Sequence, residues 1–155
     1  MRGLKLGPYQ LGDSVSVSCV VLGGQPSPGV TWWRDHQIVD DSEEQVAPGR
    51  VTNILTIPAL HRSDLHSILT CQARSSKESV PVSTSVKLDM TFQPETVRIA
   101  GLGEPMAAGQ AYHTQCVAVG ARPAPAISWW VGETRLDTSH ATIEVSSYIA
   151  PGHYS

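Results

Sequence analysis

The fold of this chain is decided by the stretch Cys19-Val-Val-Leu-Gly-Gly-Gln-Pro-Ser-Pro-Gly-Val-Thr-Trp32-Trp33. The same pattern returns 97 residues later as Cys116-Val-Ala-Val-Gly-Ala-Arg-Pro-Ala-Pro-Ala-Ile-Ser-Trp129-Trp130. A repeat of this length corresponds to a whole domain rather than to one unit of a solenoid. A cysteine followed 13 residues later by a tryptophan, with a second cysteine further along at Cys71, is typical of the immunoglobulin sandwich. The sequence therefore predicts an all-β, immunoglobulin-like fold.

The domain organisation follows from the length of the chain and the length of the repeat. A chain of 155 residues with a 97-residue period has room for one complete domain and part of a second. We expect a complete or nearly complete domain over residues 1–90 and a second domain over residues 91–155 that is truncated after about its third strand or the hairpin strand beside it. The repeat places a partner for Cys116 near position 168, beyond the last residue, so Cys116 is expected to be unpaired.

Alternating residues predict the strands of the first domain. Residues 14–21 alternate between serine and mainly apolar residues, so Cys19 and its apolar neighbours are expected to face the core. The segments 68–74 and 82–88 alternate in the same way. About 22 residues separate the tryptophan pair from the next predicted strand, which begins at Leu55. This interval is too short to favour the two extra strands of a variable-type domain, so a constant-like or intermediate strand set is expected.

The second domain is expected to contain fewer strands. The positions that indicate its first three strands are, in order, Val97 and Ile99; Tyr112, Thr114 and Cys116; and Ile127 and Trp129. Residues 141–145 are a candidate for one further strand. After these residues the correspondence with the first domain ends.

Cys19 and Cys71 lie where the intersheet disulfide of an immunoglobulin sandwich belongs, and we expect them to be joined. The alternative is a pair of reduced core thiols. Trp32 and Trp129 occupy the position of the indole that packs on this bond, so both are expected in the core. Because such disulfides persist in oxidising compartments, this pairing indicates a secreted or cell-surface protein.

The second tryptophan of each pair is expected to point away from the core, since side chains alternate along a strand. Exposed tryptophan is enriched at binding hot spots, so Trp33, Arg34 and Trp130 are candidate partner-binding residues. The alternative for these rings is local packing under a neighbouring side chain. An ion pair between Asp64 and Arg50 is a further expectation, with two solvated surface charges as its alternative.

The composition argues against several classes of function. The formal net charge is −3 and the 11 lysine and arginine residues are scattered, so no basic patch for nucleic acid or for a membrane surface is expected. The six histidines lack zinc-binding spacing, and no serine nucleophile motif is present. We therefore expect no metal, no cofactor, no small-molecule substrate and no enzymatic activity.

The chain also lacks the apolar segments that direct or anchor a protein to a membrane. No window reaches the length of apolar sequence that spans a bilayer, and the first residues lack the apolar centre of a secretory signal. Together with the expected disulfide, this favours an internal piece of a longer protein. Such a piece would lie on the extracellular side of the plasma membrane and reach the membrane only through parts outside this chain.

Further motifs extend over residues 6–137. They are Gly12-Asp13, Val30-Thr31-Trp32-Trp33-Arg34-Asp35, Leu55-Thr56-Ile57-Pro58, Arg62-Ser63-Asp64-Leu65, Leu88-Asp89-Met90, Ala108-Gly109 with Tyr112, and Arg122-Pro123. With the double tryptophan in both units, these motifs resemble the Sidestep family of immunoglobulin-superfamily cell-surface receptors. The resemblance implies a single-pass receptor that binds Beaten path-type partners in axon guidance, with this chain as its second and third domains. Nephrin-like and other adhesion receptors share part of the motifs.

The sequence thus predicts a non-catalytic recognition or adhesion module whose partner is a protein, most simply another cell-surface immunoglobulin-superfamily protein. Two alternatives stay open. The domains could act only as spacers in an adhesion receptor of nephrin-like type, or the chain could be a truncated gene model without a function of its own. An exposed Trp33 with Arg34 on a flat face would favour recognition, whereas uniformly polar outer faces would favour a spacer.

Overall fold

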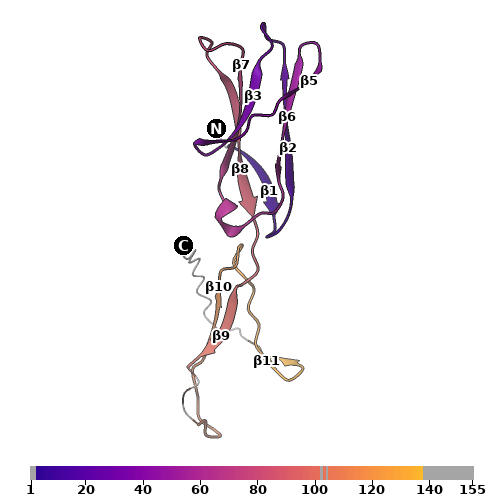
Figure 1. Ribbon diagram of the computed structural model, residues 1–155. Coiled ribbons are helices and arrows are strands. Elements are labelled where there is room, and N and C mark those ends of the chain that lie inside the picture. Colours follow the sequence, from indigo (N-terminus) through magenta and orange to yellow (C-terminus); the bar gives the residue numbers. More distant parts are fainter. Residues whose placement is uncertain (1–2, 102, 104, 138–155) are drawn as a thin grey trace. The chain divides into compact units, whose positions relative to one another are not determined.

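The computed structural model describes residues 3–101, 103 and 105–137 (Figure 1). The chain divides into two compact units, Met1–Met90 and Thr91–Ser155. Apart from one short 3-10 helix, η1 (Arg62–Asp64), the regular structure of the described residues consists of β-strands, which confirms the predicted all-β fold. Those residues include no helix of the length and apolar character needed to cross a membrane.

The first unit contains a sheet of five strands. In order across the sheet, these are β1 (Leu4–Tyr9), β8 (Val82–Met90), β7 (Ile68–Arg74), β3 (Gly29–Arg34) and β4 (Gln37–Asp40). β1 runs parallel to β8, and the other neighbouring pairs are antiparallel.

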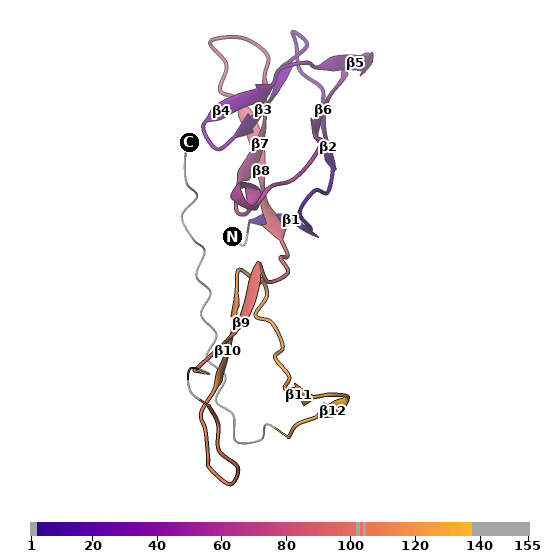
Figure 2. The ribbon, with the colours of Figure 1, turned by 60° about the horizontal axis from the view of Figure 1, so that its bottom comes forward.

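A second sheet of three strands forms the other layer of the sandwich. Its strands are, in order, β2 (Val15–Leu22), β6 (Arg50–Ile57) and β5 (Glu44–Ala47). Figure 2 shows the two layers side by side, with β2 and β6 facing the layer that contains β3 and β7. β4 belongs to the five-stranded sheet and β5 to the three-stranded sheet. The first unit therefore has the intermediate strand set that the short interval before Leu55 favours.

Alternating side chains from both sheets fill the core of the first unit. Inward residues of β2, such as Val15 and Cys19, and of β7, such as Leu69 and Cys71, are buried. The predicted disulfide between Cys19 and Cys71 is confirmed, and it ties the two sheets together. The other buried apolar residues are Val30, Trp32, Val51, Leu55, Leu60, Leu88 and Met90.

The sequence repeat is also a repeat of backbone conformation. Gly23 and Gly120 both have positive φ, at 83° and 86°, a conformation that glycine adopts without steric penalty. The peptide bonds Gln25–Pro26 and Arg122–Pro123 are both cis. The next position differs between the units, because Gly24 also has positive φ whereas its counterpart Ala121 does not.

One flank of the first unit is open where β8 begins. β1 pairs with β8 only from Val86 onwards, and within the described residues no strand pairs with the free edge of β2. Val82 and Thr84 face the same side as Cys71, yet both are exposed, Val82 to 75%. A hollow of about 480 Å³ lies between these edges, and none of the residues that line it is charged. The predicted alternation of β8 is present, but its first inward residues are left uncovered.

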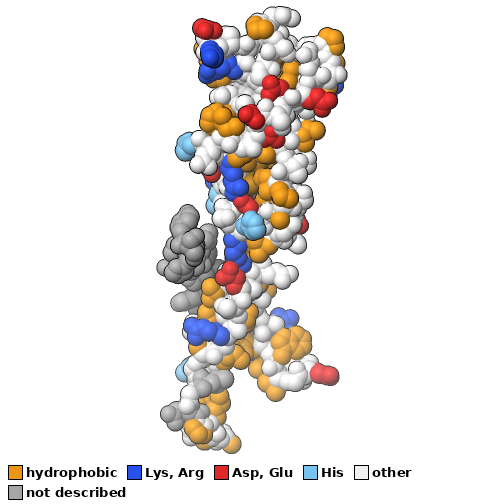
Figure 3. Space-filling model, viewed as in Figure 1, with side chains coloured by type: hydrophobic (Ala, Val, Ile, Leu, Met, Phe, Trp, Pro, Cys, Tyr) orange, Lys and Arg blue, Asp and Glu red, His pale blue; other side chains and the backbone are white. Residues whose placement is uncertain are grey.

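Exposed apolar side chains also occur on the outer face of the three-stranded sheet. Val20 and Leu22 of β2 and Ile54 of β6 are 46%, 75% and 55% exposed. Hydrophobic groups are visible along the side of the first unit that carries these strands (Figure 3). The outer surface of this sheet is therefore not uniformly polar.

The second unit is built from two small hairpins. β9 (Thr96–Ala100) pairs with β10 (Gln115–Val119), and β11 (Trp130–Val131) pairs with β12 (Thr134–Arg135). No described residue from 91 to 137 is fully buried. The predicted first strand is present as β9.

Two strand predictions in this unit need correction. Tyr112 and Thr114 precede β10, which begins at Gln115. The expected third strand around Ile127 and Trp129 is not formed: the Trp129 carbonyl oxygen accepts one hydrogen bond from Leu136 N–H, but regular pairing begins only at Trp130. The candidate strand at residues 141–145 lies outside the described residues.

Candidate recognition surface

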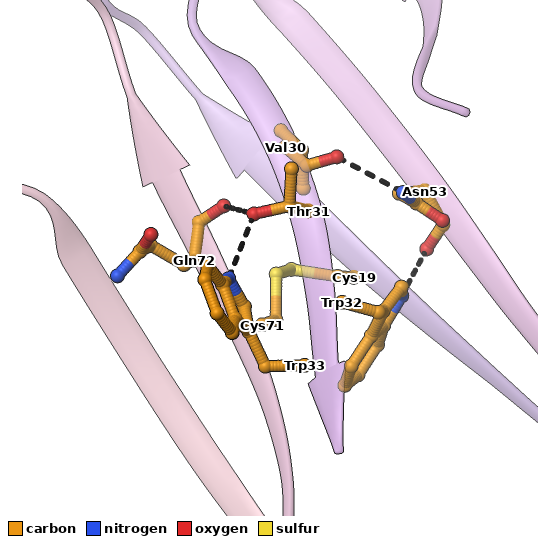
Figure 4. Close-up of a disulfide and its surroundings, with 8 residues drawn as sticks. All are labelled: Cys19, Val30, Thr31, Trp32, Trp33, Asn53, Cys71 and Gln72. Atoms are coloured by element: carbon orange, nitrogen blue, oxygen red, sulfur yellow. Dashed lines mark hydrogen bonds between the residues drawn. A yellow bond between two sulfur atoms is a disulfide. The ribbon is translucent and has the colours of Figure 1, made fainter. Parts of the chain in front are cut away.

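The two tryptophans of the first unit point to opposite sides of β3 (Figure 4). Trp32 is 3% exposed and lies opposite Cys71 in the pairing of β3 with β7. Its indole Nε1–H donates a hydrogen bond of 3.0 Å to the backbone carbonyl oxygen of Asn53 on β6. Trp32 is therefore a core residue that packs beside the disulfide and also links the two sheets.

Asn53 completes this link between the sheets. Its side-chain Nδ2 donates to the carbonyl oxygen of Val30 at 2.9 Å, and the residue is fully buried. Its Oδ1 atom has no hydrogen-bond partner among the described residues. This role of Asn53 was not predicted from the sequence, although its place between Val51 and Leu55, two inward positions of one strand, indicates a buried asparagine.

Trp33 lies on the outer face of the five-stranded sheet. Its Nε1–H donates to Thr31 Oγ1 at 3.1 Å, and the hydroxyl of Thr31 donates to the carbonyl oxygen of Gln72 at 3.5 Å (Figure 4). The ring is half-buried. Its position is thus fixed by a short chain of hydrogen bonds along β3 and β7, and one part of the indole stays accessible to solvent.

The residues around Trp33 form a mixed apolar and hydroxyl surface. In the sheet, Trp33 lies opposite Ile38 of β4 on one side and Thr70 of β7 on the other. Ile38 and Ile68 are 53% and 44% exposed, and the hydroxyls of Thr70 and Ser85 are 2.7 Å apart. We call the surface formed by Thr31, Trp33, Ile38, Ile68, Thr70, Gln72 and Ser85 the tryptophan face.

Charged groups lie beside the tryptophan face rather than within it. Lys87 of β8 and Lys5 of β1 are opposite each other in the sheet, and Lys5 Nζ is 3.9 Å from Asp89 Oδ2. At the end of β4, hydrogen bonds from the hydroxyl and the amide of Ser42 hold the pKa of the Asp40 carboxyl below its usual range. The surface around Trp33 is therefore uncharged, with charged groups at its borders.

Arg34 does not share this face with Trp33. In the pairing of β3 with β7 it lies opposite Leu69, which is an inward residue. Its guanidinium Nη2 donates to the carboxylate of Asp64 and, at 3.1 Å, to the hydroxyl of Ser67. The expectation that Arg34 joins Trp33 on a flat face is thus corrected, since successive residues of one strand point to opposite sides.

The partner predicted for Asp64 is also corrected. Asp64 is 3% exposed, and its carboxylate accepts a hydrogen bond from the backbone amide of His61 at 2.6 Å as well as the bond from Arg34. Arg50 is exposed on β6 and forms no ion pair with Asp64. The sequence could have shown that Arg34 faces inward, because side chains alternate along β3 and Arg34 follows the inward Trp32 by two residues.

In the second unit, Trp130 repeats the arrangement of Trp33. Trp130 is 55% exposed, and its Nε1–H donates to Ser128 Oγ at 2.8 Å. The prediction that Trp129 lies in a core is corrected: Trp129 is only half-buried, since no described residue of this unit is buried. Cys116 is half-buried with a free thiol. A hydroxyl two residues before the outward tryptophan thus holds the indole N–H in both units.

The side chains that bind metal ions in proteins are not clustered in the described part of the chain. Over residues 3–101, 103 and 105–137, no three histidine, cysteine, aspartate or glutamate side chains are grouped in a way that could hold a metal ion. The hollow beside β2 is lined by apolar residues, glycine, serine and threonine.

Comparison with known sequences identifies a family for the first unit. Residues 5–82 match the model of the CD80-like C2-set immunoglobulin domain. The chain is also similar to human nephrin, at 24% identity, and to mouse nephrin, at 23%, over 141 residues in each case. These matches cover 91% of this chain but only 11% of each nephrin, so the chain spans about a tenth of the length of these relatives.

Comparison with solved structures supports the fold. The ectodomain of mouse nectin-like molecule 4, which contains three immunoglobulin domains, superposes with a TM-score of 0.58. The match covers 90% of this chain and 49% of the ectodomain, at 21% sequence identity. At this identity the likeness concerns the immunoglobulin fold alone.

Proposed function

Because this chain belongs to the CD80-like C2-set immunoglobulin domain family, we propose that it is a non-catalytic recognition or adhesion module of a cell-surface receptor. The similarity to nephrins supports an adhesion-receptor type of protein. In this proposal the chain lies on the extracellular side of the plasma membrane, where the disulfide between Cys19 and Cys71 persists. Its partner is a protein that docks on the tryptophan face.

The observation that carries this proposal is the position of Trp33. A half-exposed indole, held by Thr31 and flanked by the exposed side chains of Ile38 and Ile68, is an apolar anchor at the centre of an uncharged surface. Interface cores are depleted of charge and enriched in aromatic residues, and they are surrounded by a polar rim. The hydroxyls of Thr70 and Ser85 and the nearby Lys87 supply such a rim.

The finer part of the proposal concerns the kind of receptor. The Sidestep-like motifs support a guidance or cell-recognition receptor whose partner is a Beaten path-like immunoglobulin-superfamily protein. Trp130, exposed and held by Ser128, is a second candidate contact in the same proposal. The nephrin similarity is equally compatible with a receptor of nephrin type, in which these domains hold a distal domain away from the membrane.

A binding screen tests the proposal. The full chain is secreted from eukaryotic cells, made multivalent on beads, and measured against a panel of cell-surface immunoglobulin-superfamily ectodomains that includes Beaten path-type proteins. We expect at least one ectodomain to bind, and we expect Trp33→Ala to weaken that binding at least about tenfold, as is common for a hot-spot tryptophan. Trp33→Phe, which keeps an apolar ring, should retain part of the affinity.

The matched control is Ile54→Ala, which removes an exposed apolar side chain from the outer face of the other sheet. This variant should bind like the unchanged chain. If no ectodomain binds, or if Trp33→Ala and Ile54→Ala behave alike, the tryptophan face is not a recognition surface and the spacer role is supported instead. Retention of the Cys19–Cys71 disulfide in each variant shows that the loss does not come from misfolding.

A further inference from the structure

The first unit has four edge strands, and three of them carry features that prevent pairing with another strand. β1 contains Lys5 and Pro8 and has an irregular register with β8. β4 ends in Asp40, β5 begins with Glu44, and each has a register shift against its neighbour. Charge, proline and bulges at an edge are the usual protection against association with other chains.

β2 has none of these features. Its eight residues, Val15–Leu22, contain no charged residue and no proline, and its register with β6 is unbroken from Val15 to Leu22. Within the described residues its other edge pairs with no strand. Unpaired backbone N–H and C=O groups along a regular strand form a template for another strand. The contrast with the other three edge strands indicates that the free edge of β2 pairs with a strand from outside the first unit.

The surroundings of this edge define what can occupy it. The adjacent hollow of about 480 Å³ is lined without a charged residue, and Val80 and Val82 at its border are 88% and 75% exposed. Leu22 at the end of β2 is also 75% exposed. An occupant must therefore be an extended, uncharged strand that brings apolar side chains to the flank, because a charged strand would be desolvated there without a partner charge.

We propose that the occupant is β2 of a second copy of this chain, paired antiparallel across a two-fold axis. β2 is itself uncharged, regular and apolar at alternate positions, so it meets every requirement that its own edge imposes. A two-fold axis makes the interface self-complementary and closes it at two copies. The two three-stranded sheets then form one continuous six-stranded sheet, and each copy covers the mouth of the other's hollow. This inference is independent of the tryptophan face, which lies on the other sheet.

Sedimentation velocity on the full chain tests the dimer. The chain carries Cys116→Ser, so that its free thiol cannot form a disulfide between copies. We expect a concentration-dependent equilibrium between monomer and dimer. The double substitution Val20→Lys with Leu22→Lys should raise the dissociation constant at least about tenfold, because it adds two positive charges to the pairing strand of each copy, and lysine on an edge strand opposes pairing. Ile54→Lys places the same charge on the same face, one strand further from the axis, and should leave the dimer intact.

Hydrogen exchange provides a second measurement that does not depend on a substitution. In the dimer, backbone amides on the free edge of β2 should exchange more slowly than in diluted protein, whereas amides at the edge of β4 should not change. A chain that is monomeric at all concentrations overturns the proposal, and so does a dimer that the double substitution leaves intact. Slow exchange of the β2 edge in a monomer would also overturn it, because it would assign the edge to a different extended segment.

Discussion

At Asn53, one buried residue joins the two sheets of the first unit through both its side chain and its backbone. The side-chain amide donates to the carbonyl oxygen of Val30, and the backbone carbonyl oxygen accepts the indole N–H of Trp32. Both partners belong to β3. The side chain of Asn53 therefore links β6 to Val30, while its backbone carbonyl oxygen holds the indole of Trp32 beside the disulfide.

Asn53→Ala should lower the free energy of unfolding by about 1–3 kcal/mol, because the carbonyl oxygen of Val30 is left buried without its donor. Urea unfolding of the oxidised chain, followed by tryptophan fluorescence, measures the change. Thr52→Ala, on the outer side of the same strand, is the control and should change stability by less than about 0.5 kcal/mol. Equal effects of the two substitutions would show that the bond to Val30 contributes nothing specific.

The ion pair between Arg34 and Asp64 gives a second prediction at this scale. Arg34→Ala should lower the free energy of unfolding by about 3 kcal/mol, because it leaves a carboxylate buried without its positive partner. Arg50→Ala removes an exposed arginine that makes no ion pair with Asp64, and should be close to neutral. Thermal unfolding of both variants at neutral pH decides between the observed pair and the pair expected from the sequence.

At the scale of the elements, β1 depends on the close approach of its backbone to β8. Gly7 has φ of +116°, and a Cβ atom there would collide with the backbone carbonyl oxygen of Asp89. Gly12 also has positive φ, at +82°, but has open space around the position of its Cβ. The two glycines therefore separate the effect of backbone conformation from the effect of contact.

Gly7→Ala should destabilise the first unit by more than Gly12→Ala, with a difference of about 1–2 kcal/mol from the added steric conflict. Hydrogen exchange should locate the change, with faster exchange of amides in β1 and in the second half of β8. The opposite order of the two variants, or unchanged exchange in β8, would mean that β1 is not held by this contact.

The elements that the sequence predicts well are those for which one residue pattern carries all of the information. Serine alternating with apolar residues before Cys19, and Leu69 alternating with polar residues before Cys71, predict β2, β7 and the disulfide, and the structure confirms them. The alternation of residues predicts which side of a strand each side chain faces. It does not predict which residues from other segments lie on that side. For this reason the exposure of Val82 and the partner of Arg34 were not predicted, since both depend on neighbours from distant segments.

At the scale of the whole molecule, the two units differ in how much they bury. The first unit has a core closed by a disulfide between cysteines 52 residues apart, which in the chain-entropy model contributes about 4 kcal/mol of stability. In the second unit no described residue is fully buried, and Cys116 has a free thiol. The stability of the described chain is therefore concentrated in the first unit.

This difference predicts the chemistry of the three cysteines. Under native, non-reducing conditions, alkylation followed by mass spectrometry should modify Cys116 and leave Cys19 and Cys71 unmodified, because these two are joined and buried. After reduction in denaturant, all three should react. Native modification of Cys19 or Cys71, or a disulfide that includes Cys116, would show that the assignment of the repeat to two sandwich units is wrong.

The hydroxyl that accepts the N–H of each outward tryptophan has a consequence for the energetics of docking. Because Thr31 already accepts the hydrogen bond of the Trp33 indole, a protein that covers this ring needs to supply no acceptor and strips no water from the N–H group. The same bond restricts the rotamer of the ring before a partner arrives, so less side-chain entropy is lost when the complex forms. Removing the hydroxyl with Thr31→Val should therefore raise the dissociation constant of the complex, although it leaves every atom of the indole in place.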